Sequence, residues 1–269
     1  MTNRFDMLPF RIGTTSYIIP DDILPNVSYL AGKVQDIELV LFDVDEYCNI
    51  PNEAQASELN KLAKENGLSY TVHLPLNLNF SDNDRDISIE KAMKVIDGTR
   101  MLDPLAYVCH LECKDIPKTE GSELHSWQTQ RIRAVNALSA ESGIRSAFAI
   151  ENLETYPIEW NEPVIQSCGT HYCLDIGHLF LQKRDPVPVM RKWLPLTSVV
   201  HLHGIGTRDH QSLSHMSIEL IQTVIDEFFL ANYRGVVTLE IFNEADFQSS
   251  LEIVMDCAAR HRTKETLIN

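Results

Sequence analysis

The sequence predicts an α/β fold, a single (β/α)8 barrel, and three observations support this prediction. Short apolar segments rich in Val, Ile and Leu alternate with stretches of helical periodicity, which is typical of parallel strands covered by helices. The alternation repeats eight times within 269 residues, and a barrel requires eight such units. An open doubly wound sheet is the rival, but no Gly-x-Gly-x-x-Gly follows the first expected strand.

The expected strands are apolar runs of five to eight residues, several of which end in His, Asp or Glu. Their length and their β-branched residues distinguish them from the longer periodic segments. They cover residues 10–17, 37–42, 69–74, 106–111, 147–151, 170–175, 198–202 and 236–241.

The expected helices show local start and stop signals. Asp21 and Asp22 place negative charge at the start of the first helix, and Gly67 ends the second. Pro186 and Pro188 interrupt the helix over 179–194, because proline is costly inside a helix. No composition shift marks a linker, so residues 1–269 are assigned to one domain. The helices cover residues 20–34, 52–66, 84–102, 126–142, 163–168, 179–194, 217–232 and 246–260.

Composition restricts the class of protein. With 44% hydrophobic and 23% charged residues the chain resembles an ordinary globular protein, and no apolar run approaches the roughly 20 residues of a membrane span. The first residues lack the pattern of a signal peptide, so the cytoplasm is expected. A net charge of -15 without a basic patch disfavours nucleic acid as a partner. The six cysteines contain no Cys-x-x-Cys, and buried reduced thiols are expected.

Histidines and carboxylates gather where the expected strands end. The carboxyl ends of barrel strands converge on one mouth, so these side chains are expected to meet in space. Imidazole and carboxylate are ligands that divalent transition metals prefer, and buried carboxylates need such a partner. We therefore predict zinc, between one and three ions, with manganese as the alternative. The expected ligands are His73, His110, Glu151, Asp175, His178, His201, His210 and Glu240.

Other polar residues have less definite roles. Glu38 and Glu112 can be ligands, can orient a ligating imidazole, or can be solvated. His203, two residues after His201, is a candidate for binding substrate. Metal-assisted hydrolysis would use Glu151 and Glu240 as catalytic carboxylates that bridge the ions.

These residues also carry a resemblance. Their order along the chain resembles the xylose-isomerase-like barrel superfamily, which includes sugar isomerases, sugar epimerases and the endonuclease IV type of zinc phosphodiesterase. The many histidines are more similar to the phosphodiesterase branch than to the isomerases, which use mostly carboxylates. The resemblance covers nearly the whole chain and implies a metal-dependent hydrolase.

A narrower resemblance lies near the start of the chain. Residues 11–27 (RIGTTSYIIPDDILPNV), followed by Glu38-Leu39-Val40-Leu41-Phe42, look like the cobamide-remodelling phosphodiesterases. This resemblance implies hydrolysis of the phosphoester that joins the nucleotide loop to the corrinoid, with release of cobinamide.

The chain departs from the endonuclease pattern at one position. That branch supplies Asp-x-His to a zinc from the loop after the seventh strand, whereas Arg208-Asp209-His210 stands at the matching positions. A guanidinium has no lone pair for a metal, but its planar fork matches phosphate oxygens. Arg208 is therefore expected to bind the scissile phosphate and to stabilise the developing charge.

Two other function classes remain open. One is a single-metal isomerase or epimerase of a sugar or sugar phosphate, in which Glu151 and Glu240 exchange a substrate proton. The other is a barrel that binds a corrinoid without turnover. In every case the expected partner is a small molecule, and neither nucleic acid nor a membrane is expected.

Overall fold

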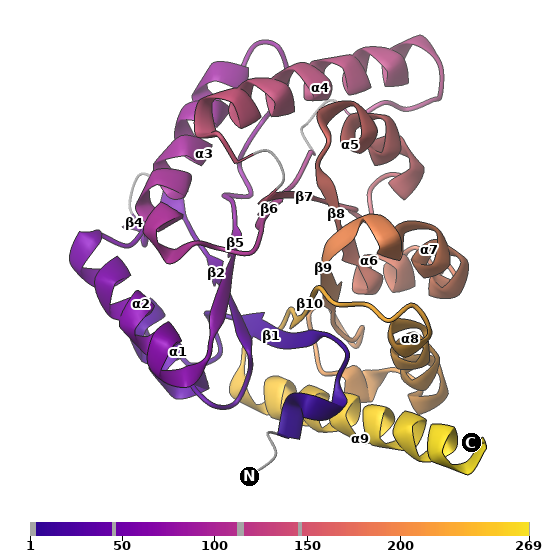
Figure 1. The fold of residues 1–269 in the computed structure, drawn as a ribbon. Helices are drawn as coiled ribbons and strands as arrows, with labels where there is room; N and C mark the ends of the chain where they lie inside the picture. Colours follow the sequence, from indigo (N-terminus) through magenta and orange to yellow (C-terminus); the bar gives the residue numbers. More distant parts are fainter. Residues whose placement is uncertain (1–3, 45–46, 112–115, 145–146, 269) are drawn as a thin grey trace. The chain divides into compact units, whose positions relative to one another are not determined.

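The computed structural model describes residues 4–44, 47–111, 116–144 and 147–268. Eight parallel strands form a closed barrel in the order β1-β10-β9-β8-β7-β6-β5-β2, which confirms the predicted (β/α)8 fold (Figure 1). The strands are β1 (Arg11–Thr15), β2 (Asp36–Val40), β5 (Ser69–His73), β6 (Tyr107–Cys109), β7 (Phe148–Glu151), β8 (His171–Asp175), β9 (Thr197–Leu202) and β10 (Val236–Leu239).

Helices follow the strands as the sequence predicts. An Asn52 cap that bonds reciprocally with Gln55 starts α2, and the left-handed Gly67 ends it. The α-helices are α1 (Ile23–Leu30), α2 (Glu53–Asn66), α3 (Arg85–Thr99), α4 (Ser122–Ser142), α5 (Glu162–Cys168), α6 (Ile176–Leu181), α7 (Pro186–Trp193), α8 (Ile218–Leu230) and α9 (Glu244–Ile268). Short 3-10 helices are η1 (Arg4–Met7), η2 (Arg100–Leu102), η4 (Ile158–Asn161), η5 (Leu194–Leu196) and η6 (Leu213–His215).

Residues 1–38 and 174–269 form one compact unit, here called unit 1. Within it β1 pairs with β10 and with β2, and β10 pairs with β9, so that Thr15 is opposite Glu38 and Thr238 is opposite His201. Helices α8 and α9 lie side by side in this unit (Figure 1). The register thus fixes the positions of Glu38, in the middle of β2, and of His201, near the end of β9.

Residues 39–173 form the second compact unit, here called unit 2. Parallel pairing runs from β5 to β6, from β6 to β7 and from β7 to β8. In this register Cys109 is opposite Ile150, and Glu151 is opposite Cys173. Helices α3 and α4 lie side by side (Figure 1).

Several elements differ from the sequence prediction, among them α1, which covers only Ile23–Leu30 of the expected 20–34, and α9, which continues to Ile268 instead of ending at 260. The segment expected as one interrupted helix over 179–194 is two helices: α6 begins directly after Asp175, and Pro186 occupies the first turn of α7. Proline is tolerated there because the first turn needs no amide hydrogen. Helix α4 begins at Ser122, before the expected position 126. A small hairpin, β3 (Asp43–Val44) with β4 (Tyr47–Cys48), had no periodic signal because it is too short.

The five cysteines that the structure describes are free, and all except Cys48 are buried, as expected for reduced thiols. Burial raises the pKa of Cys109 to about 12, with a smaller contribution from Glu151. Cys113 lies outside the described residues. Within the described part of the chain, no helix has the length and apolar character needed to cross a membrane.

Candidate metal centres

The ends of three neighbouring strands in unit 2 bring His73, His110 and Glu151 together. His73 ends β5, Glu151 ends β7, and His110 directly follows β6. The Nε2 atoms of both imidazoles face one carboxylate oxygen: Oε2 of Glu151 lies 3.3 Å from His73 and 3.0 Å from His110. The ligand atoms of all three residues lie within 4.8 Å of one another. We call this group the Glu151 cluster.

The backbone determines which nitrogen of His73 faces Glu151 with a lone pair. His73 Nδ1 lies 2.8 Å from the carbonyl oxygen of Leu74, and a carbonyl can only accept, so Nδ1 carries the hydrogen. In the neutral ring Nε2 then has a lone pair, and it faces an acceptor oxygen. Two acceptors at this distance require a shared cation, either a proton or a metal ion.

In unit 1, Asp175, His201 and Glu240 form the centre of a second group. Asp175 ends β8, His201 lies near the end of β9, and Glu240 follows β10. His201 Nδ1 lies 3.2 Å from Oε2 of Glu240 and 3.8 Å from Oδ2 of Asp175. Their ligand atoms lie within 4.8 Å of one another, and we call this group the Asp175 cluster.

Glu38 holds the opposite side of the His201 ring. Its Oε2 lies 3.0 Å from His201 Nε2, and neither side chain is exposed. In the neutral ring the Nε2–H donates to this carboxylate, which leaves the Nδ1 lone pair toward Asp175 and Glu240. A carboxylate behind a ligating imidazole fixes its tautomer and its orientation. Of the three roles left open for Glu38 by the sequence, this geometry matches the orienting role.

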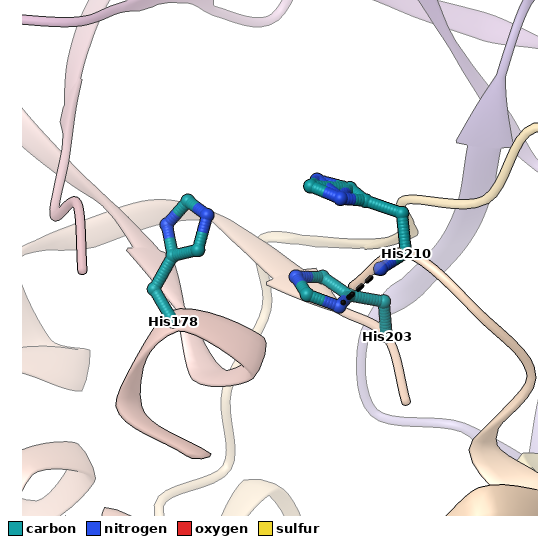
Figure 2. Close-up of side chains that lie close together, drawn as sticks. All are labelled: His178, His203 and His210. Atoms are coloured by element: carbon teal, nitrogen blue, oxygen red, sulfur yellow. Dashed lines mark hydrogen bonds between the residues drawn. The ribbon is translucent and has the colours of Figure 1, made fainter. Parts of the chain in front are cut away.

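Three further histidines lie near one another in unit 1 (Figure 2). His178 is on α6, His203 directly follows β9, and His210 lies in the turn that comes next. The His203 and His210 rings stack with centroids 4.2 Å apart, and His178 lies edge-on to both. His178 Nδ1 lies 3.3 Å from Oδ2 of Asp175, and His210 Nε2 lies 3.3 Å from Oε2 of Glu240.

Burial and charge shift the pKa values of two of these rings in opposite directions. Burial lowers the pKa of His210, and the carboxylate of Glu240 offsets this only in part. Burial is also the largest single influence on the pKa of His203 and lowers it, but the charge and hydrogen bonding of Asp175 together with the charge of Glu240 outweigh burial, so the net shift is upward. The downward shift at His210 favours the neutral imidazole, which is the form that a metal ligand requires.

Glycine at position 177 explains how His203 fits beneath this group. A Cβ at this position would overlap the His203 ring, so the helix turn after Asp175 can pack against the ring only with glycine there. The sequence motif Asp175-Ile176-Gly177-His178 thus combines a ligand pair with a space for a third residue. The glycine in the sequence indicates that another group packs closely here, but the sequence alone does not show that this group is the ring of His203.

Arg208 lies in the turn that the backbone pairing of Gly204 with Gln211 closes. Its side chain is exposed, and its backbone N–H donates to the Gln211 side chain. In the part of the chain that the structure describes, its guanidinium has no hydrogen bond or ion pair, so its expected contact with phosphate stays a prediction. Glu112, the other carboxylate with an open role, lies outside the described residues.

Within each unit the structure therefore brings a set of the predicted ligands together. His73, His110 and Glu151 meet in unit 2, and the remaining predicted ligands meet in unit 1 around Asp175. Both groups fit a divalent transition metal, because each places imidazole nitrogens and carboxylate oxygens toward a common point. The assignment of individual ligands and of substrate contacts, including that of the fully buried His203, stays a prediction.

The sequence model of the xylose isomerase-like TIM barrel family matches residues 34–257, which is most of the chain. The chain belongs to this family. A search of curated proteins found no match. Known members of the family are mostly enzymes, and binding of divalent metals in the family agrees with the two clusters found here.

Solved structures share the fold at low sequence identity. A D-tagatose 3-epimerase-like protein has a TM-score of 0.75 at 20% identity, with 95% of this chain and 99% of that chain covered. Endonuclease IV from Thermus thermophilus has a TM-score of 0.70 at 15% identity, covering 93% and 99%. The 3-keto-D-glucoside 4-epimerase from E. coli has a TM-score of 0.67 at 16% identity, covering 94% and 99%. Identities this low establish the common fold alone.

Proposed function

We propose that this member of the xylose isomerase-like family is a metal-dependent phosphodiesterase that hydrolyses the phosphoester of a cobamide nucleotide loop and releases cobinamide. The observation that carries the proposal is the presence of two ligand clusters, each with a histidine lone pair aimed at a carboxylate. A single-metal isomerase needs only one such group. The resemblance of residues 11–27 to cobamide-remodelling phosphodiesterases supports the substrate.

Zinc ions held by these clusters would supply an activated water near neutral pH and offset the negative charge of the phosphoryl group. The residues of the chain provide the conditions for this chemistry. Glu151 shares one oxygen between His73 and His110, so a single carboxylate holds both imidazoles. Glu240 likewise faces His201 and His210 with its Oε2. Manganese is the alternative ion.

Arg208 has the role of binding the scissile phosphate in this proposal. Its exposed guanidinium is always charged and can donate two parallel hydrogen bonds to phosphate oxygens. It lies on the same turn as His210, so a phosphate held by Arg208 would be close to the Asp175 cluster. This contact would stabilise the charge that develops on the phosphoryl oxygens.

A second candidate function is epimerisation or isomerisation of a sugar or sugar phosphate. Two of the three solved structures named above are described as epimerases or epimerase-like. The compact group of Asp175, His201 and Glu240 is by itself sufficient to hold one ion. This function leaves no evident role for the pair of histidines on Glu151.

Incubation of the zinc-loaded and the manganese-loaded protein with a cobamide, followed by product mass, tests the proposal. We expect cobinamide and a released nucleotide-loop fragment. Conversion of a free ketose without any action on the cobamide would instead establish the epimerase. Tight corrinoid binding without a product would indicate a binding protein.

A parallel incubation with abasic duplex DNA tests the exclusion of nucleic acid. The net charge of -15 predicts turnover of DNA far slower than that of the cobamide, because DNA binding needs several Lys and Arg contacts. Comparable rates on the two substrates would reverse the assignment. The cytoplasmic location and the single domain over residues 1–269 stay predictions.

A further inference from the structure

His203, like His201, is a fully buried histidine in the region of the Asp175 cluster. Its side chain is fully buried, it packs directly on Gly177, and His210 stacks on its other face. His178, His203 and His210 place one nitrogen each within 4.8 Å of one another, so proximity alone would make His203 the third ligand of an ion. The hydrogen bonds of the His203 ring lead to a different role.

The backbone of His210 determines the tautomer of His203 (Figure 2). The amide N–H of His210 points to Nδ1 of His203 at 3.1 Å. An amide can only donate, so this Nδ1 must hold a lone pair, and the hydrogen of the neutral ring is on Nε2. The carbonyl of Gly204, at 3.4 Å, could accept only from a hydrogen on Nδ1 that the His210 amide excludes.

The Nε2–H of His203 faces a carboxylate. Nε2 lies 3.5 Å from Oδ1 of Asp175, and both side chains are fully buried. The same Oδ1 accepts the backbone N–H of His178 at 2.7 Å. The other oxygen, Oδ2, is the one that lies near His178 Nδ1 and His201 Nδ1. The His178 amide therefore donates to Oδ1, the His203 Nε2–H faces the same oxygen at an ion-pair distance, and Oδ2 is the oxygen that faces the rings of His178 and His201.

We propose that His203 is a positioning residue whose Nε2–H holds Asp175 so that Oδ2 serves as the metal ligand, and that His203 is not itself a ligand. Its only lone pair is used by the His210 amide, which also fixes the turn that carries His210. One ring thereby sets the orientation of a carboxylate ligand and of a neighbouring histidine. The inference rests on the proposed function only in assigning a metal to Asp175.

A matched pair of substitutions separates a positioning role from ligation. His203→Gln keeps an N–H near the former Nε2 and loses the acceptor for His210, whereas His203→Asn keeps that acceptor and loses the donor to Asp175. Neither variant has an imidazole. His125, an exposed histidine on α4, provides the control His125→Asn. Zinc per chain is measured by elemental analysis, and zinc affinity by titration of the metal-stripped protein.

The positioning role predicts that both variants keep the zinc content of the wild type under saturating zinc. Affinity should fall about 10-fold to 100-fold in His203→Asn, the usual range for losing a residue that orients a ligand. The zinc affinity of His203→Gln should fall clearly less than that of His203→Asn. Loss of the same single ion in both variants would overturn the proposal. Both variants lack the imidazole, so they would behave alike only if that imidazole were a ligand. Absence of zinc from the wild type would instead reject the proposed function.

The tautomer of His203 can also be measured in the wild type, which does not depend on whether the variants fold. Long-range proton–nitrogen NMR of protein labelled with 15N-histidine distinguishes the two neutral tautomers at pH 8.5. We expect His203 to be the Nε2–H form both with and without zinc. An Nδ1–H form whose Nε2 signal shifts when zinc is added would overturn the proposal even though zinc binds.

Discussion

The Glu151 cluster and the Asp175 cluster differ in how their histidines are held. In the Glu151 cluster a backbone carbonyl, that of Leu74, fixes His73, and both imidazoles converge on one carboxylate oxygen. In the Asp175 cluster side chains take this role, because Glu38 lies behind His201 and His203 lies behind Asp175. The same ligand chemistry can thus be positioned by the main chain or by a layer of buried side chains.

The two clusters should therefore differ in how they respond to point mutations. A support made by the main chain cannot be removed by a point mutation, whereas Glu38 and His203 can each be replaced while the ligands stay in place. The Asp175 cluster should therefore be tunable without loss of its ligands, and the Glu151 cluster should respond only when a ligand itself is changed.

Removal of a central carboxylate should have the largest effect. We expect Asp175→Asn and Glu151→Gln each to lower kcat/KM on the cobamide by about 10³-fold, because both leave imidazoles without the carboxylate that shares their cation. Asparagine retains the ability to cap α6, where Asp175 accepts the backbone N–H of His178. Kinetics with either variant near wild-type activity would show that its cluster is not part of the catalytic machinery.

Loss of the phosphate contact should be the next largest effect. Arg208→Ala should lower kcat/KM by about 10², and Arg208→Lys should not restore it, because an ammonium lacks the planar fork. Zinc content should stay at the wild-type value, since a guanidinium cannot ligate. Thr207→Ala on the same turn is the control. Turnover of Arg208→Ala close to wild type would make the arginine an ordinary surface residue.

Replacement of Glu38 isolates the side-chain support of the Asp175 cluster. Glu38→Gln removes the charge behind His201 at constant volume and should weaken zinc binding there by about 10-fold to 100-fold. Zinc bound by His73 and His110 should be unaffected. Competition titration with a zinc chelator measures both sites, and an equal loss of affinity at both would contradict the difference drawn between the clusters.

The smallest expected effect comes from helix caps distant from the ligands. Asn52→Ala on α2 and Ser217→Ala on α8 each remove one side-chain cap, at a cost of about 1 kcal/mol in the free energy of unfolding. Urea unfolding measures this loss, and zinc affinity should stay unchanged in both units. A parallel loss of zinc affinity would mean that the effects at Glu38 reflect general destabilisation.

The alternation of apolar strands and amphipathic helices was sufficient to predict the barrel, since periodicity reports which faces are buried. The strand-end positions of His73, Glu151 and Asp175 were also predictable, because barrel topology brings strand ends together. The sequence could not show that Glu38 and His203 orient neighbouring ligands. A buried carboxylate or imidazole has the same sequence pattern whether it binds a metal or a neighbouring side chain. That distinction depends on which atom faces which partner, as at His203 Nδ1.

Zinc stoichiometry tests most directly whether each cluster holds its own ion. Metal-stripped wild type, His73→Ala and His201→Ala are titrated with zinc and analysed for bound metal after buffer exchange. We expect at least two ions in the wild type and the loss of a different ion in each single variant, so that a variant with both substitutions loses both ions. A wild type that binds one ion or none, or two variants that lose the same ion, would contradict it.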